Sequence, residues 1–245
     1  MTRRTRPGDT RMCPGDTTTR VPGVIAFDVN ETLLDLSALD PLFERAFGDA
    51  SLRPLWFAQM LQLAFVGVIT GNYIDFGTAQ RAALTMVAQR TGTDLDEQDA
   101  DEIVGAMSSL PPHPEVREAL QRLHEAGLRL AAFTNSTREV AEAQISNAGL
   151  RDLFEQVLSA DEVKRLKPAP EPYRMVAERF ATQVAEVRLV AAHAWDVAGA
   201  LAAGCAAAFV ERPGMVLSPI GAQPDVVGAD LGEVAERILA VDAPR

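Results

Sequence analysis

Short apolar runs alternate with segments of helical period along most of this chain, and this alternation restricts the fold more than any other feature. Each apolar run predicts a buried β-strand. The runs lie at residues 24–28, 129–133, 156–158, 187–192 and 206–210. Helical segments separate the later runs, at residues 114–126, 138–148, 171–180 and 197–203. Strands that alternate with helices are typical of a parallel sheet with crossover helices, so we predict an α/β fold with a Rossmann-like parallel core.

The segment between Leu36 and about Leu110 breaks this alternation. It has no strand pattern and contains amphipathic stretches at residues 40–47, 54–69, 75–90 and 96–107. We therefore predict that residues 37–109 form an inserted helical cap, while residues 23–36 and 110–245 form the core. Because the insertion follows the first strand, we expect it to cover the edge of the sheet where that strand ends.

Residues 1–22 predict a flexible N-terminal extension, because they hold a repeated PGDT, three prolines and no apolar periodicity. No apolar run follows the arginines of this segment, so we predict no secretory signal. The two cysteines, Cys13 and Cys205, lie too far apart to suggest a disulfide framework or a metal site. These features predict a protein of the reducing cytoplasm.

The net charge limits the partners. The chain has 34 acidic and 23 basic residues, which gives a net charge of −11. A surface that binds nucleic acid or an anionic membrane needs a basic excess, so a small-molecule substrate is the better prediction. The apolar stretch at 190–210 is interrupted by His193 and Asp196, which favours a buried strand and helix over a membrane span.

Polar side chains follow four of the predicted strands. The carboxyl ends of parallel strands meet at one edge of a sheet, and ligands bind there near the point where the strand order reverses. In chain order the polar side chains are Asp28, the pair Thr134 and Asn135, Lys167, and then His193 with Asp196. The sequence therefore predicts a site at this edge.

These residues lie in four motifs whose order resembles the haloacid dehalogenase superfamily. The motifs are FDVNET at 27–32, FTNST at 133–137, KPAPEPY at 167–173 and AAHAWD at 191–196. Each motif is weak alone, but four in order are specific. The resemblance spans residues 24 to about 228 and is strongest to the L-2-haloacid dehalogenase, or type II, branch. It implies the capped Rossmann-like fold, no metal or other cofactor, and a homodimer formed through the cap.

The resemblance also implies a role for the charged residues. Asp28 would be the nucleophile that forms an ester with the substrate. Lys167 would keep Asp28 ionised, since a nearby cation lowers the pKa of a carboxyl group. Asp196 would position Lys167 and the water that hydrolyses the ester. His193 stands where the family has asparagine, and it either activates that water or replaces the hydrogen bond of the amide.

Further residues are expected to orient Asp28 or to contact a substrate, which the resemblance suggests is a small carboxylate. The type II branch has an arginine on the first cap helix, and that position is Phe57 here. Arg53 lies one helical turn earlier and could substitute for it. Trp195 is expected in the pocket wall. The complete set is Asn30, Thr32, Thr134, Asn135, Tyr173, Phe57, Arg53 and Trp195.

Two positions separate halide displacement from phosphoryl transfer. Phosphatases of the superfamily have a second aspartate two residues after the nucleophile and acidic magnesium ligands after the fourth strand. Those positions are Asn30 and Ala192 here. An amide cannot donate a proton as an acid does, magnesium prefers oxygen ligands that include carboxylates, and a halide leaves without protonation. We therefore predict a metal-independent hydrolase that displaces halide from a short 2-haloalkanoic acid.

Three alternatives stay open at this stage. The same nucleophile could open a strained ring, such as an epoxide or a small cyclic amine, with His193 as the proton donor. A phosphatase could use other metal ligands. A binding protein could keep the fold and lack turnover.

Overall fold

The computed structural model describes residues 22–242 of the chain, so the predicted extension lies outside the described residues except for residue 22. The fold contains a six-stranded sheet with the strand order β3-β2-β1-β4-β5-β6, in which every neighbouring pair is parallel. The strands are β1 (Val24–Phe27), β2 (Arg129–Thr134), β3 (Gln156–Ser159), β4 (Val187–Ala191), β5 (Ala206–Val210) and β6 (Val226–Gly228). The predicted α/β fold with a parallel core is confirmed.

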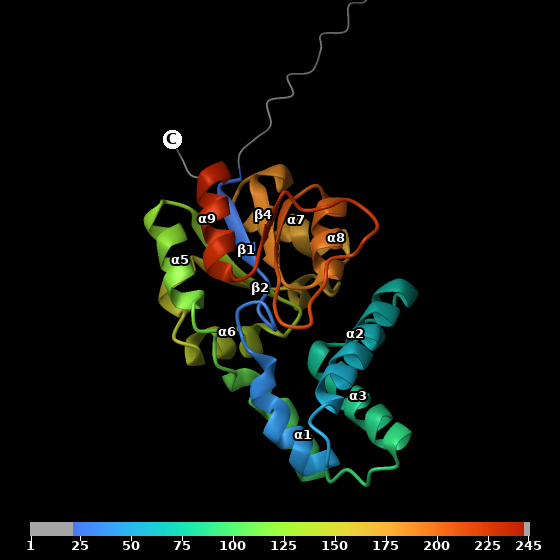
Figure 1. The fold of residues 1–245 in the computed structure, drawn as a ribbon. Helices are drawn as coiled ribbons and strands as arrows, with labels where there is room; N and C mark the ends of the chain where they lie inside the picture. The colour runs from blue at the N-terminus through green and yellow to red at the C-terminus, as the bar shows by residue number, and fades with distance from the viewer. Residues whose placement is uncertain (1–21, 243–245) are drawn as a thin grey trace, which may run out of the picture.

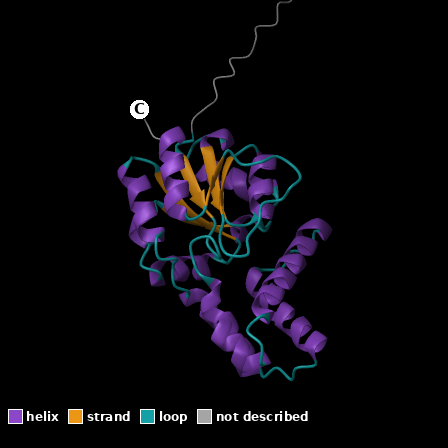
Figure 2. Cartoon of the chain, viewed as in Figure 1, coloured by secondary structure: helices purple, strands orange, loops and turns teal. Residues whose placement is uncertain are grey.

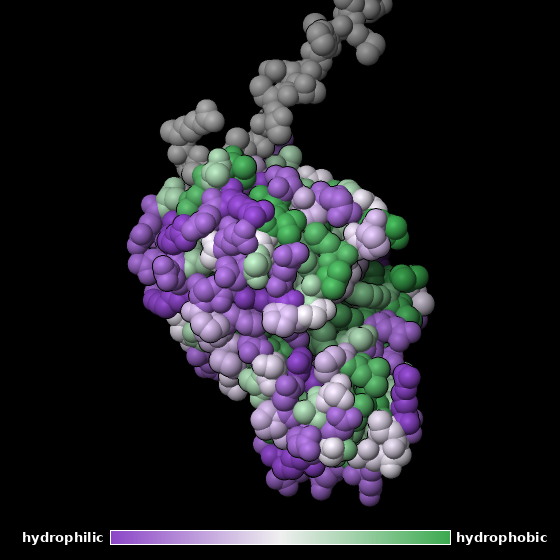
Figure 3. Space-filling view, viewed as in Figure 1, coloured by the Kyte–Doolittle hydropathy of each residue, from purple (hydrophilic) through white to green (hydrophobic). Residues whose placement is uncertain are grey.

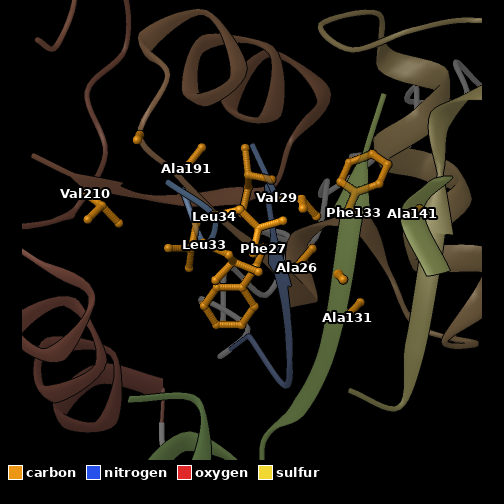
Figure 4. Close-up of a cluster of buried hydrophobic side chains, with 14 of the residues drawn as sticks. Ala26, Phe27, Val29, Leu33, Leu34, Ala131, Phe133, Ala141, Ala191 and Val210 are labelled. Atoms are coloured by element: carbon orange, nitrogen blue, oxygen red, sulfur yellow. The ribbon is translucent and has the colours of Figure 1, made fainter. Parts of the chain in front are cut away.

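β1 lies inside the sheet, between β2 and β4, and its four residues are apolar and buried. A strand covered on both faces has no polar side, which explains the continuous apolar run in the sequence. Figure 4 shows Phe27 close to Leu33 and Leu34, beside Ala131 and Phe133 of β2. The chain builds β2 and β3 on one side of β1 and then returns to β4 on the other side. The strand order therefore reverses beside β1, where parallel sheets bind ligands.

Helices cover both faces of the sheet, as Figure 1 and Figure 2 show. α5 (Val116–Glu125) and α9 (Leu231–Asp242) pack together on one face. α7 (Pro170–Arg179) and α8 (Ala194–Ala203) pack together on the other. α6 (Arg138–Asn147) packs beside β3.

Five α-helices lie between β1 and β2, and the first four form one group at residues 40–106, which is called the helical insertion below. They are α1 (Asp40–Phe47), α2 (Leu52–Thr70), α3 (Phe76–Thr91) and α4 (Glu97–Ala106). Figure 1 shows them together, beyond the end of β1 that leads into α1.

The helical insertion has its own buried centre. Trp56 of α2 is fully buried and packs against Phe43, with the ring centroids 5.3 Å apart and the planes tilted by 48°. Its Nε1 donates to the carbonyl of Gln80 at 3.0 Å. α2 is long and apolar enough to cross a membrane by length and composition, and 28% of its most apolar window is buried in the protein. Its buried side joins α1, α2 and α3 into one unit.

Candidate active site

Asp28 follows β1 directly and lies at the carboxyl edge of the sheet. Its amide donates to the carbonyl of Val190 at 3.0 Å, which extends the pairing of β1 with β4 by one residue. The residue is 5% exposed. Its Oδ1 accepts from Lys167 Nζ at 2.9 Å, and its Oδ2 accepts from Thr32 Oγ1 at 2.9 Å and lies 3.0 Å from His193 Nδ1.

These contacts determine the charge of Asp28. Burial alone would raise the pKa of its carboxyl group, but the Lys167 ammonium and the hydrogen bond with His193 outweigh burial and hold the pKa well below its usual range. Asp28 is therefore ionised at neutral pH, as a nucleophilic carboxylate must be.

Lys167 links Asp28 to Asp196. Its Nζ donates to Asp28 Oδ1 at 2.9 Å, to Asp196 Oδ2 at 2.6 Å and to the carbonyl of Phe133 at 3.0 Å. These bonds use all three donors of the ammonium group. Burial lowers the pKa of the completely buried Lys167, but the charges of Asp196 and Asp28 raise it further, so the net shift is upward. Lys167 stays protonated between the two carboxylates.

Asn135 holds the backbone of Lys167 from both sides. The Lys167 amide donates to Asn135 Oδ1 at 2.8 Å, and Asn135 Nδ2 donates to the Lys167 carbonyl at 3.2 Å. Asn135 follows β2 and Lys167 follows β3, so this pair joins two strand ends. Both the oxygen and the nitrogen of the Asn135 side-chain amide are therefore used in positioning Lys167.

Asp196 lies in the first turn of α8 and is completely buried. Its Oδ1 accepts from Tyr173 Oη at 2.5 Å, in addition to the bond from Lys167 to Oδ2. Burial raises the pKa of Asp196, Lys167 opposes this shift and the charge of Asp28 adds to it, so the net direction is upward. Burial also raises the pKa of Tyr173 well above its usual value, which keeps its hydroxyl a neutral donor.

Thr32 and Glu31 shape the turn after β1. Thr32 Oγ1 donates to Asp28 and accepts from the amide of Ala192 at 2.9 Å, so it ties the ends of β1 and β4 together. Glu31 has a φ of 62°, in the left-handed region that costs a side chain with a Cβ roughly 1 kcal/mol. This conformation directs its carboxylate to Arg53 in the helical insertion, at 3.0 Å between Oε1 and Nη1.

His193 takes the extended conformation of an N-cap, with φ −102° and ψ 119°, so α8 begins at Ala194 rather than at the predicted residue 197. Its ring stacks between Phe57, at 5.6 Å and 22°, and Trp195, at 5.3 Å and 29°. A carboxylate only accepts hydrogen bonds, so the His193 nitrogen that contacts Asp28, Nδ1, carries a proton. In the neutral ring the other nitrogen, Nε2, then has the lone pair. Nε2 is buried and has no hydrogen-bond partner among residues 22–242.

Two cavities meet at these aromatic rings. An inner chamber of about 10 Å³ lies against Asp28, and an outer pocket of about 470 Å³ opens on the other side. The inner chamber has room for about one water molecule. Phe57, Leu61, His193 and Trp195 line both cavities and are called the partition below. Figure 3 shows hydrophobic residues gathered in the recess between the helical insertion and the rest of the molecule.

The predicted site residues other than Arg53 lie in two places. Those in the wall of the inner chamber are Asp28, Asn30, Phe57, Thr134, Asn135, His193 and Trp195. Thr32, Lys167, Tyr173 and Asp196 lie behind that wall, completely or almost completely buried, and hold Asp28 or one another. The structure thus places Tyr173 under Asp196, away from both cavities.

Arg53 lines only the outer pocket. Its Nε donates to Asp40 Oδ1 at 2.6 Å and its Nη1 to Glu31 Oε1 at 3.0 Å. The structure therefore does not bring Arg53 to Asp28, and its guanidinium is already paired with two carboxylates.

Sequence reasoning did not find Gln144 of α6 as part of this site. Its Nε2 donates to Asn30 Oδ1 at 2.9 Å and to the carbonyl of Met107 at 2.8 Å, so it fixes the orientation of Asn30. A single glutamine within a helix gives no sequence signal. The loop at residues 213–216, which lines the outer pocket, was also not predicted.

Comparisons with known proteins agree with this geometry. The family model of haloacid dehalogenase-like hydrolases matches residues 22–204. Haloacetate dehalogenase H-2 of Moraxella sp. (strain B) is 32% identical over 203 residues, which cover 82% of this chain and 91% of that protein. The (S)-2-haloacid dehalogenase of Pseudomonas sp. (strain YL) is 30% identical over 214 residues, which cover 86% of this chain and 92% of that protein.

A solved structure of L-2-haloacid dehalogenase from Xanthobacter autotrophicus, with chloropropionic acid covalently bound, is also similar. Its TM-score is 0.82 at 26% identity, and the match covers 89% of this chain and 98% of that chain.

The parallel sheet, the reversal of its strand order beside β1 and the buried, ionised aspartate at that place define an α/β protein with a polar site at the carboxyl edge of its sheet. The family model spans residues 22–204, and both relatives are aligned over most of their length. The chain belongs to the haloacid dehalogenase-like hydrolases. The predicted resemblance to this superfamily and to its type II branch is confirmed.

Proposed function

We propose that this protein hydrolyses the carbon–halogen bond of short 2-haloalkanoic acids through an ester on Asp28. The observation that carries the proposal is the ionised Asp28 carboxylate, which Lys167, Thr32 and His193 hold against the inner chamber. The printed names of the relatives, a haloacetate dehalogenase and an (S)-2-haloacid dehalogenase, support the substrate class. The covalently bound chloropropionic acid of the Xanthobacter autotrophicus structure supports a covalent step.

The first step is a displacement at carbon. One carboxylate oxygen of Asp28 attacks C2 of the substrate, and the halide leaves with the electron pair of the broken bond. Lys167 and Thr32 fix the direction of the carboxylate, which converts much of the entropy cost of the encounter into a cost of folding. No proton is needed for the halide to leave, which fits the amide of Asn30 near the nucleophile.

The donor set around Asp28 supports displacement at carbon over phosphoryl transfer. Asn30 Oδ1 is already bonded to Gln144, and Ala192 offers only backbone groups. Among residues 22–242, no cluster of three His, Cys, Asp or Glu side chains could hold a metal ion. The positive charge that faces both Asp28 and Asp196 is the ammonium of Lys167.

The second step is hydrolysis of the ester. A water in the inner chamber attacks Cγ of Asp28, and His193 takes its proton through Nδ1, the ring nitrogen that lies 3.0 Å from Asp28. The ester carries no charge, so Asp28 no longer needs the Nδ1 proton, and in the neutral ring with its proton on Nε2 the lone pair of Nδ1 is free to accept it. The bond between Cγ and the substrate-bound ester oxygen then breaks, and the 2-hydroxy acid leaves after that oxygen gains the proton. Asp28 is regenerated with one oxygen from the solvent.

Heavy-oxygen water tests the ester directly. With enzyme in excess over 2-chloropropionate in ¹⁸O-labelled water, the hydroxyl oxygen of the first product should come from Asp28 and carry no label, while the enzyme gains one labelled oxygen. Mass spectrometry of the product and of the Asp28 peptide measures both. Labelled product from the first turnover would contradict the mechanism, and turnover of epoxides or cyclic amines without halide release from haloacids would favour ring opening.

A second prediction concerns His193. In His193→Phe, ester formation should continue and ester hydrolysis should slow by about 10²-fold, because the base that accepts the water proton is lost. Halide release should then show a burst of about one equivalent per site, with the ester visible as an added mass on the intact protein. His124→Phe, at an exposed histidine of α5, is the matched control. Loss of steady-state turnover with no added mass would argue against this role.

We also propose that the protein acts in the cytoplasm and as a homodimer. The sparse cysteines support the first proposal. Val66 and Ile69 of α2, which are 49% and 82% exposed, support the second because they give the helical insertion an apolar outer face.

A further inference from the structure

The two cavities beside His193 differ greatly in size and character. The inner chamber of about 10 Å³ has room for about one water, whereas the outer pocket measures about 470 Å³. Most of the residues in the outer wall are apolar. They include Ala58 and Leu61 of α2, Trp195 of α8, and Met215 and Val216 of the loop after β5. The outer pocket is therefore suited to an apolar group of considerable length.

A haloacid that reacts at Asp28 cannot fit in the inner chamber alone, because even three carbons with a carboxylate exceed the volume of one water. Part of the wall must give way to the substrate. The polar side of the wall contains Asn30 and Thr134, which suit the carboxylate, whereas the partition is aromatic and apolar. The substituent on C2 is thus directed to the partition, and the space behind the partition is the outer pocket.

The charges in the outer pocket favour an uncharged chain. Its wall contains one guanidinium, of Arg53, and one carboxylate, of Glu31, and these two side chains form an ion pair at 3.0 Å. They are only 14% and 11% exposed, so the pair is largely withdrawn from the pocket. A second carboxylate at the far end of a substrate would meet a cation that is already neutralised.

We propose that the outer pocket is the subsite for the alkyl chain on C2, so that the preferred substrates are 2-haloalkanoic acids with unbranched chains of about six carbons rather than haloacetate or 2-halopropionate. This inference rests on the proposed function. Each methylene that leaves water for the apolar pocket should raise kcat/KM about fourfold, a ratio that follows from the burial of one methylene group.

The test measures bromide release from 2-bromopropionate, 2-bromobutanoate, 2-bromohexanoate and 2-bromooctanoate. The value of kcat/KM should rise by about fourfold per methylene up to the hexanoate. A value that is constant or falls with chain length would overturn the subsite while leaving the proposed function intact. No bromide from any member, 2-bromopropionate included, would overturn the proposed function itself.

Ala58→Trp tests the location of the subsite. Ala58 lines the outer pocket and not the inner chamber, so an indole there should fill the space for the chain. The ratio of kcat/KM for 2-bromohexanoate to that for 2-bromopropionate should fall at least tenfold. Ala82→Trp is the matched control, since Ala82 is exposed on α3 and lines neither cavity. An unchanged ratio in Ala58→Trp, or an equal fall in both variants, would overturn the subsite.

Discussion

Replacing Asp28 with asparagine should reduce kcat/KM for halide release by about 10⁴-fold or more, because a neutral amide is a poor nucleophile and Asp28 is the carboxylate that lines the inner chamber among residues 22–242. Asp28 Oδ1 accepts a hydrogen bond from Lys167, and Oδ2 accepts from Thr32 and His193, so all three side chains orient this one carboxylate. Halide release measures turnover, and the intact mass measures the ester after a short exposure to substrate.

The wild-type protein should gain the mass of the carboxyalkyl group of the substrate in that exposure, and Asp28→Asn should gain none. Asp94→Asn, at an exposed aspartate of the helical insertion, should behave as wild type. Circular dichroism checks that the Asp28→Asn protein is folded. Folded Asp28→Asn protein that keeps more than a few per cent of wild-type turnover would show that another residue attacks the substrate.

The core of the fold could be predicted because its signal is local. Five strands lie where the apolar runs predicted them, since a strand buried on both faces cannot accept polar residues. β6 (Val226–Gly228) was missed because three residues are too few to show a pattern. α9 (Leu231–Asp242) was also missed, although Val234 and Ile238 on its buried side have helical spacing, so the signal was present in the sequence.

The reacting groups of the site could be predicted for a topological reason. Asp28 follows β1, Lys167 follows β3, and His193 and Asp196 follow β4. A parallel sheet brings the carboxyl ends of its strands to one edge. Their order along the chain was therefore enough to place them together.

The surroundings of these groups could not be predicted in the same way. Arg53 pairs with Glu31 and Asp40 because of how α2 packs against α1 and against the turn after β1, and no local pattern encodes that packing. Tyr173 reaches Asp196 only because α7 and α8 lie side by side. Both residues were predicted as part of the site, but as contacts of Asp28 or of a substrate. Their actual partners follow from how the helices pack, which the sequence pattern does not give.

Replacing Lys167 with methionine should reduce kcat by about 10²-fold or more and destabilise the fold by about 3–5 kcal/mol, because it leaves two buried carboxylates without their cation. The stability difference from wild type depends on pH. The pKa of Asp28 is lower in the folded state than in the unfolded state. Its contribution to the free energy of unfolding is therefore lost progressively as the pH falls below the unfolded-state pKa. The pKa of Lys167 is higher in the folded state than in the unfolded state. Its contribution to the free energy of unfolding is therefore lost as the pH rises through the folded-state pKa. The difference should therefore be largest between about pH 5 and pH 10.

The activity of this variant should also change its pH dependence, which separates loss of charge from loss of packing. In the wild-type protein the depressed pKa of Asp28 keeps the nucleophile ionised as the pH falls from 7 to 5. Without Lys167 the burial of Asp28 is no longer opposed by that cation, so its pKa rises and the remaining activity should fall over this interval. Lys164→Met, at a lysine on the surface, should keep the wild-type profile. If the activity of Lys167→Met fell between pH 7 and pH 5 no more than that of wild type, Lys167 would not be what keeps Asp28 ionised.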